Sequence, residues 1–253
     1  MQIIDISMTT DTDPFMEGRG VVFEPHAMGA EYNQTHYDID PNHWPTPGAA
    51  FASDALEITS HTGTHMDSPW HYGPVMADGS KPKTIDEWPL ERCMGDGVVI
   101  DITDAEDGAE VSRERIQEKL RAIDYEIKPG DIVLTMTGND KHFDTDEYLS
   151  RGGGPSRQAL EWILDQGVTV VGTDAWSYDR PYGAWAADYH KHDRDPSYLW
   201  PCHLLGLEKE YVHIEKLANL DQLPPHGFKV IALPLKIARG TAGPVRAIAI
   251  IED

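Results

Sequence analysis

The stretch that decides the fold is HTGTHMDSPWH, residues 61–71, which closely follows the strand-like apolar run Leu56–Thr59. Gly63 and Pro69 both disfavour a helix, because glycine loses more backbone freedom on folding and proline has no amide N–H to donate. The stretch therefore predicts an extended turn at the end of a strand.

Three histidines and one aspartate fall within these eleven residues. In an extended chain, side chains two residues apart share a face and lie roughly 6.5–7 Å from each other. His65, Asp67 and His71 are then expected on one face, and a turn at Gly63 brings His61 round to join them. Imidazole and carboxylate groups suit zinc, manganese or iron, and a site with few protein ligands leaves room for water. The alternative, ordinary packing, explains such a dense group poorly.

Elsewhere the sequence predicts an α/β protein that is richer in strand than in helix. Two segments have helical signals: one is capped by Ser112, and the other is capped by Ser156 and ends at Gly167. Short apolar runs predict eight strands, at Ile3–Ile6, Leu56–Thr59, Val98–Ile102, Ile132–Thr135, Val168–Val171, Tyr211–Ile214, Val230–Leu233 and Ala247–Ile251.

Two long stretches, 9–55 and 174–200, have neither period and are predicted to be functional loops. The second is rich in aromatic residues and histidines, among them Trp185 and His190. We expect it either to cover a binding site, with Trp185 and His190 contacting substrate, or simply to pack over an edge of the core. No linker divides residues 1–253, so one domain is predicted.

The composition excludes some classes of protein. The chain has 253 residues and a formal net charge of -22, from 21 basic and 43 acidic residues. So negative a surface repels phosphate backbones and anionic membranes, so we expect neither nucleic-acid nor membrane binding. Two cysteines form no disulfide framework. The N-terminus lacks the pattern of a signal peptide, and no apolar run is long enough to span a membrane, so a cytoplasmic location is predicted.

A second group of possible ligands, His203 and Glu215, lies downstream. Spacing alone does not select these two residues. Other histidines and glutamates compete with them for the same role, namely His213, His226, Glu208 and Glu210.

The pattern His61-x-Gly63-Thr64-His65-x-Asp67-x-Pro69-x-His71 resembles the signature of the cyclase family, which includes bacterial kynurenine formamidases and isatin hydrolases. All seven fixed positions match, which makes the pattern specific. Weaker similarity extends over most of the chain, at Pro89-Leu90-Glu91 to Asp101, Gly130–Gly138, Gly172-Thr173-Asp174, His203-Leu204-Leu205 and Ile214–Leu220.

The resemblance implies a swivelling β/β/α fold and a homo-oligomer, a dimer or a tetramer. It assigns His61, His65 and Asp67 to a first metal ion, zinc or manganese. Where two ions are bound, it assigns Asp67, His203 and Glu215 to the second. It gives His71 the role of general acid and base, which suits a histidine that titrates near neutrality beside a cation.

The predicted activity is hydrolysis of a C–N or C–O bond in a small cyclic or aromatic substrate, with metal-bound hydroxide as nucleophile. The alternatives are a kynurenine formamidase acting on N-formylkynurenine and a non-catalytic metal-binding protein. The sequence departs from the formamidases at Asp11–Phe15, where they carry a substrate-contacting tryptophan. It departs again at Arg180–Pro201, which is longer and more aromatic than in those enzymes.

Overall fold

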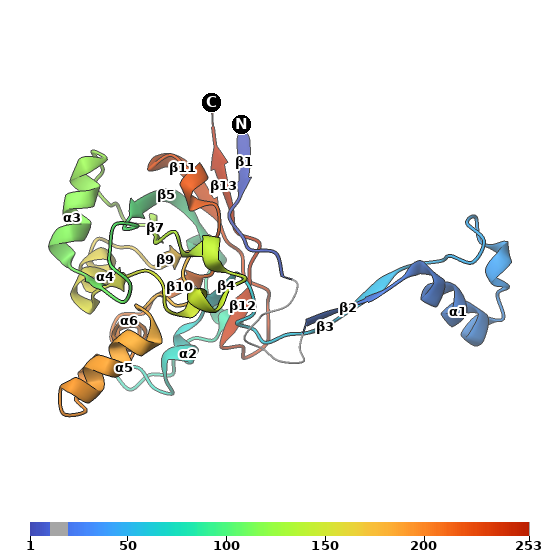
Figure 1. Cartoon of the computed structure of the whole chain (residues 1–253), viewed down its shortest axis with the longest axis horizontal. Coiled ribbons are helices and arrows are strands. Elements are labelled where there is room, and N and C mark those ends of the chain that lie inside the picture. The colour runs from blue at the N-terminus through green and yellow to red at the C-terminus, as the bar shows by residue number, and fades with distance from the viewer. Residues whose placement is uncertain (11–19, 253) are drawn as a thin grey trace. The chain divides into compact units, whose positions relative to one another are not determined.

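The computed structural model describes residues 1–10 and 20–252 (Figure 1). The departure from the formamidases at Asp11–Phe15 lies outside the described residues. The chain divides into two compact units. One comprises Met1–Thr9 and Ser60–Asp253, and the other comprises Thr10–Thr59.

The larger unit is built on a nine-stranded mixed sheet with the order β1-β13-β11-β5-β7-β9-β10-β4-β12. The central strands β5, β7, β9 and β10 run parallel, and the strands outside them pair antiparallel. Because β1 pairs with β13, the two ends of the chain lie together in Figure 1. The strand bounds are β1 Gln2–Asp5, β4 His65–Asp67, β5 Met94–Asp101, β7 Ile132–Met136, β9 Val170–Thr173, β10 Val212–Glu215, β11 His226–Ile231, β12 Ala242–Pro244 and β13 Ile248–Ile251.

Both predicted helices of this unit are confirmed. They are α3 (Arg113–Ala122) and α4 (Arg157–Asp165). Ser112 Oγ accepts from the Arg115 amide at 3.3 Å, and Ser156 Oγ accepts from the Ala159 amide at 3.0 Å. Each cap satisfies an amide that the first helical turn leaves without a partner.

The two helices pack on one face of the sheet. This face can be identified because neighbouring residues of a strand point to opposite faces. Val98 and Val133 belong to the hydrophobic cluster that contains α3 and α4, whereas Val99 and Ile132 belong to a second cluster on the other face. The predicted strand-rich α/β class is confirmed. Within the described residues, no helix has the length and apolar character needed to cross a membrane.

The remaining elements of this unit are the helix α5 and several shorter pieces. They are α2 Pro69–Tyr72, α5 Tyr182–Lys191, α6 Pro201–Leu205, the paired strands β6 Glu110–Val111 and β8 Gly154–Pro155, and the 3₁₀ turns η2 Ile85–Glu87, η3 Leu90–Cys93, η4 Asn139–His142, η5 Asp146–Leu149, η6 Pro196–Tyr198 and η7 Leu220–Gln222.

The smaller unit contains β2 (Gly20–Glu24), α1 (His26–Tyr37), η1 (Pro41–His43) and β3 (Ser53–Glu57). Strands β2 and β3 form an antiparallel pair, with Gly20 opposite Glu57. The predicted strand Leu56–Thr59 therefore begins earlier than expected and ends at Glu57.

The prediction that stretches 9–55 and 174–200 lack regular structure was wrong. Helix α1 lies in the first and helix α5 in the second. Helix α1 buries only Gly29 and Ala30, and α5 buries no residue completely. Neither helix needs an apolar stripe, so hydrophobic periodicity did not reveal them.

Candidate metal centre

The pairing of β4 with β10 places the predicted ligands next to each other. In this antiparallel pair His65 lies opposite Glu215, and Asp67 lies opposite His213. Directly paired residues have Cβ atoms roughly 4.5–5.5 Å apart. The intervening Met66 belongs to the apolar cluster on the other face of the sheet. One face of two short strands therefore presents two imidazoles and two carboxylates, all buried.

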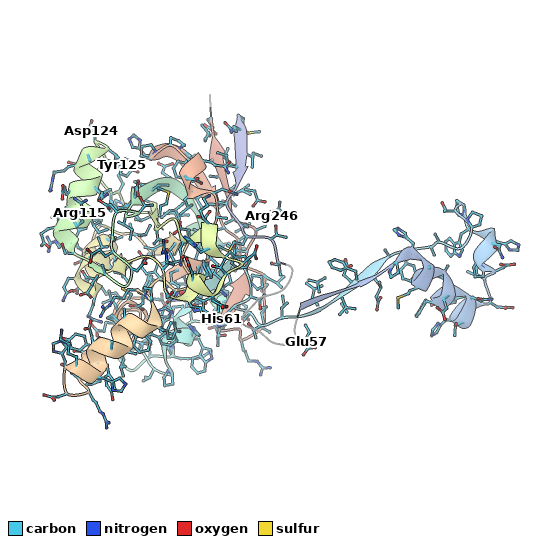
Figure 2. The ribbon with its side chains drawn as sticks, in the orientation of Figure 1. Glu57, His61, Arg115, Asp124, Tyr125 and Arg246 are labelled. Atoms are coloured by element: carbon cyan, nitrogen blue, oxygen red, sulfur yellow. The ribbon has the colours of Figure 1, made fainter. Side chains whose placement is uncertain are left out.

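The backbone before and after β4 positions the other two histidines of the motif. Gly63 has φ +61°, a left-handed conformation that suits glycine, and it precedes the strand at the turn that carries His61 (labelled in Figure 2). The prediction of an extended chain as far as His71 was wrong, because Pro69 opens the one-turn helix α2. Proline suits the first helical position, where its missing N–H costs nothing. Helix α2 brings His71 Nε2 to 3.6 Å from Asp67 Oδ2.

The two carboxylate oxygens of Asp67 face different histidines. Oδ1 lies 2.8 Å from His61 Nδ1 and 3.2 Å from His65 Nε2. His65 Nδ1 donates to the Gly63 carbonyl at 2.9 Å, which leaves a lone pair on Nε2. Within the described residues this buried Nε2 has no hydrogen-bond partner. A lone pair aimed at a carboxylate is repelled unless a cation lies between them, so this arrangement fits a bound metal.

His203 is oriented in the same way on the side of Oδ2. Its Nδ1 lies 2.6 Å from Asp179 Oδ2 and donates to it, because the carboxylate only accepts. His203 Nε2 then carries a lone pair, 3.9 Å from Asp67 Oδ2 and 3.6 Å from Glu215 Oε1. Asp179 also accepts from the backbone amides of Cys202 at 2.8 Å and His203 at 3.1 Å, which fixes the start of α6.

Asp179 was not predicted from the sequence, and His213 was predicted only as a competitor for the role of His203 and Glu215. His213 Nε2 lies 3.1 Å from Asp67 Oδ2 and 3.2 Å from Glu215 Oε1. The spacing of His213 and Glu215, two residues apart on a strand, was a signal that they share a face. No comparable signal exists for Asp179, which lies 24 residues before its partner.

The site favours positive charge. Burial opposes ionisation of Asp67, but the neighbouring imidazoles, His65 first, hold the pKa of its carboxyl well below the ordinary value. Burial and Asp67 likewise oppose ionisation of Glu215, yet its contacts with His213 lower its pKa to about 2. Burial disfavours the charged form of His213 too, but hydrogen bonds to Asp67 and Glu215 raise its pKa to about 9. Two buried carboxylates need compensating cations, and a divalent metal supplies that charge.

His71 has a different electrostatic environment. Burial lowers its pKa to about 4, and the nearby His61 and His203 act in the same direction. Desolvation outweighs the attraction to Asp67 and favours the neutral imidazole. At neutral pH His71 is an uncharged imidazole able to accept a proton. Its side chain is 23% exposed, so it lies at the open edge of the group.

The rings of Trp200, Tyr182 and Trp185 lie in a row beside the candidate metal ligands and are called the aromatic wall below. Trp200 stacks on His203, with ring centroids 4.3 Å apart, and contacts His71 at 5.5 Å. Tyr182 bridges Trp200 and Trp185, at 5.9 and 5.0 Å. Trp185 is thus connected to His203 through the rings of Tyr182 and Trp200. His190 is exposed near the end of α5, where its ring lies 5.2 Å from Tyr189.

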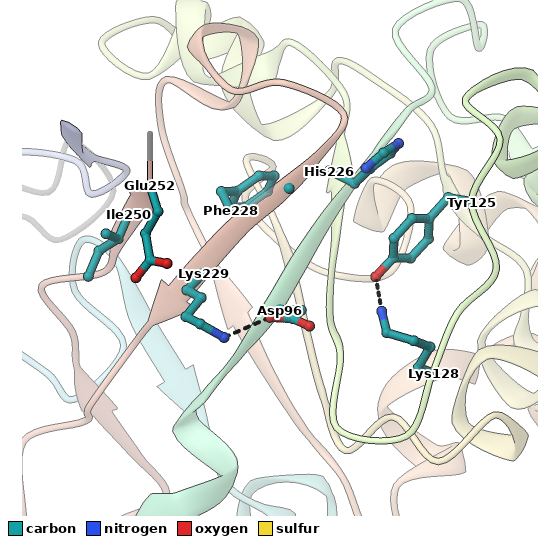
Figure 3. Close-up of a pocket in the computed structure, with 9 residues that line it drawn as sticks. Asp96, Tyr125, Lys128, His226, Phe228, Lys229, Ile250 and Glu252 are labelled. Atoms are coloured by element: carbon teal, nitrogen blue, oxygen red, sulfur yellow. Dashed lines mark hydrogen bonds and ion pairs between the residues drawn. The ribbon is translucent and has the colours of Figure 1, made fainter. Parts of the chain in front are cut away.

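A cavity of about 300 Å³ lies away from this group, beside β5 and β11 (Figure 3). Its two lysines are already paired: Lys229 Nζ lies 2.9 Å from Asp96 Oδ1, and Lys128 Nζ lies 2.5 Å from the Tyr125 hydroxyl. Of the possible ligands named from the sequence, only His226 lines this cavity. It is therefore a weaker candidate for chemistry than the buried histidines and carboxylates.

The fold and this group of ligands define a protein of the metal-dependent hydrolase class. The chain belongs to the cyclase family, since the family model described as putative cyclase matches residues 4–180. The family and the hydrolytic class predicted from the motif are confirmed.

Relatives with assigned activities cover most of the chain. An isatin hydrolase of Roseibium aggregatum is 29% identical over 86% of this chain and 79% of its own length. A kynurenine formamidase of Salinibacter ruber is 31% identical over 77% of each chain. These relatives support an enzyme over a non-catalytic metal-binding protein.

Solved structures support the predicted cyclase-type fold. An isatin hydrolase bound to the product analogue thioisatinate has a TM-score of 0.76 at 24% identity and covers 100% of this chain and 93% of its own. Isatin hydrolase A from Labrenzia aggregata, bound to benzyl benzoate, has a TM-score of 0.73 at 27% identity. The match covers 100% of this chain and 94% of the hydrolase chain.

Proposed function

We propose that this chain hydrolyses the amide bond of a small cyclic or aromatic substrate, a lactam first and a lactone or ester second. The observation that carries the proposal is the buried Asp67 carboxylate, whose two oxygens face two separate sets of imidazoles. The names of the relatives, isatin hydrolase and kynurenine formamidase, point to the same bond type.

The residues assigned to the metal are those of the motif together with His203 and Glu215, which the family resemblance implies. His61, His65 and Asp67 hold one ion, and Asp67, His203 and Glu215 hold a second. Zinc and manganese both accept this donor set. When bound, such a cation polarises the substrate carbonyl and lowers the pKa of a water molecule toward neutrality.

The protein's own groups position the ligands and move the proton. Asp179 holds His203 in the tautomer whose Nε2 is free to bind, at 2.6 Å from Nδ1. Glu215 Oε1 accepts from the Tyr178 amide at 2.8 Å, which fixes that carboxylate. His71, neutral and partly exposed, takes a proton at its imidazole from the attacking water and delivers it to the leaving nitrogen or oxygen.

The aromatic wall is the proposed substrate contact. Trp185 and Trp200 offer flat apolar faces for a ring-shaped substrate. The indole N–H of Trp185 is buried and has no hydrogen-bond partner among the described residues, and a substrate carbonyl that reached it would satisfy it. His190 stays a predicted contact, although its place at the exposed end of α5 offers it weaker support.

We also propose that the protein is a cytoplasmic homodimer or homotetramer. In this proposal the two units of the chain belong to one functional domain, residues 1–253. The smaller unit exposes large apolar side chains, namely Val22, Phe23, Met28, Tyr32, Tyr37, Ile39, Phe51 and Leu56. A two-stranded pair with one helix buries too little to be stable alone. A second copy of the chain is the proposed cover for this surface.

The test is metal-dependent turnover. Protein purified without a chelating tag is stripped of metal, assayed, and assayed again after addition of zinc or manganese. We expect hydrolysis of isatin and related lactams to fall to background and then return. Activity that is indifferent to chelation contradicts the proposal. N-formylkynurenine in the same panel tests the rival kynurenine formamidase activity, which the 31% identical relative favours.

A further inference from the structure

We infer that His213 is an additional ligand of the second metal ion, so that Asp67, His203, His213 and Glu215 together form a four-ligand site. This inference rests on the proposed function and adds a residue that the motif does not contain. All four side chains are buried, and their donor atoms lie within 4.8 Å of one another.

The distances around His213 are slightly shorter than those between neighbouring ligands of one ion. Its Nε2 lies 3.1 Å from Asp67 Oδ2 and 3.2 Å from Glu215 Oε1. His203 Nε2 lies 3.6 Å from the same Glu215 oxygen. Donor atoms at about 2.0–2.2 Å from a tetrahedral ion are roughly 3.3–3.6 Å from each other, so little movement is needed to admit one.

Hydrogen bonds behind the ring orient His213 toward the carboxylates. Tyr211 donates its hydroxyl proton to the Cys202 carbonyl at 2.8 Å, so its oxygen is left as an acceptor. His213 Nδ1 lies 3.2 Å from that oxygen and 3.3 Å from the Tyr72 hydroxyl, so a proton on Nδ1 has the Tyr211 oxygen as its acceptor. The Nδ1–H tautomer leaves the Nε2 lone pair facing Asp67 and Glu215, as expected of a ligand held by a second group.

A proton on Nε2 in place of a metal accounts for fewer contacts. It satisfies His213 and the two carboxylates, but it does nothing for His203 Nε2, whose lone pair faces those same carboxylate oxygens at 3.6 and 3.9 Å. One cation placed among all four donors satisfies both imidazoles together. The geometry therefore points to a shared ion.

The experiment compares metal binding rather than activity. Metal-free protein is titrated with Zn²⁺ by calorimetry, and bound metal is counted after dialysis. The variants are His213→Leu, which fills the buried space without a donor, and Tyr211→Phe, which removes only the orienting hydroxyl. His226→Leu is the matched control, because His226 Nε2 contacts the Ile123 carbonyl at 3.1 Å, outside the site. Circular dichroism checks the fold of each.

We expect two ions per chain in the wild type and in His226→Leu. His213→Leu should keep the first affinity and lose at least about 100-fold in the second, since even outer-shell changes cost 10–100-fold. Tyr211→Phe should lose about 10–100-fold in the second affinity only. With Mn²⁺, the electron paramagnetic resonance spectrum should change from that of a coupled pair to that of a single ion in His213→Leu.

Three results overturn the inference and leave the proposed function standing. They are unchanged binding of two ions by His213→Leu, a single ion of equal affinity in the wild type and His213→Leu, and a second ion gained on removal of His213. A wild-type protein that binds no ion overturns the proposed function itself.

Discussion

The Asp179 carboxylate lies 2.6 Å from His203 Nδ1, and both side chains are buried. This contact joins the segment after β9 to helix α6 and decides which nitrogen of His203 faces Asp67. Because such outer contacts fix the tautomer and raise the basicity of a ligand, Asp179 would strengthen the binding of a metal ion by His203 without contacting that ion.

The first prediction concerns Asp179. Asp179→Asn should weaken metal binding by about 10–100-fold, because the amide no longer holds the Nδ1–H tautomer as a carboxylate does. Calorimetric titration with Zn²⁺ measures the change. Asp188→Asn is the control, since Asp188 on α5 pairs with Arg180 at 2.5 Å and not with His203. An Asp179→Asn variant with wild-type affinity contradicts the role.

The second prediction separates proton transfer from metal binding. His71→Ala should bind metal as the wild type does, yet lose about 10²–10⁴-fold in kcat, the usual contribution of a general acid or base. Dialysis followed by elemental analysis and steady-state kinetics measure the two properties. A variant that turns over at the wild-type rate, or that loses its metal, contradicts the assignment.

The third prediction concerns the aromatic wall. Trp185→Ala should raise KM for a lactam about tenfold with a smaller change in kcat, since it removes binding area and one N–H donor. Trp162→Ala is the matched control, because Trp162 lies on α4 and contacts Arg113. The same assay on His190→Ala tests the other predicted contact. An unchanged KM in Trp185→Ala refutes its role.

The fourth prediction concerns assembly. Phe23 is 70% exposed on β2, so Phe23→Glu should weaken self-association at least about tenfold, through loss of buried aromatic surface. Light scattering across a concentration series measures the mass. Leu90→Glu changes a 58% exposed apolar residue of the other unit and serves as the control. Equal masses in Phe23→Glu and the wild type exclude this surface as the interface.

Local signals predicted much of the fold. Ser112 and Ser156 mark helix starts because a cap is made within one turn of its own residue. The helices α1 and α5 escaped prediction because a helix that buries no apolar stripe has no periodicity to detect. The one-turn helix at Pro69 escaped because proline stops a helix in its interior but begins one at its first position.

The sequence by itself determined the family, the hydrolytic class and the candidate ligands of the 61–71 motif, because these side chains are close along the chain. Only the tertiary structure decided that His213 lies beside Asp67, 146 residues away, and that Asp179 holds His203. The physical reason is strand register. A shift of one residue between β4 and β10 turns every side chain of one strand to the opposite face, and that pairing depends on how the whole sheet packs.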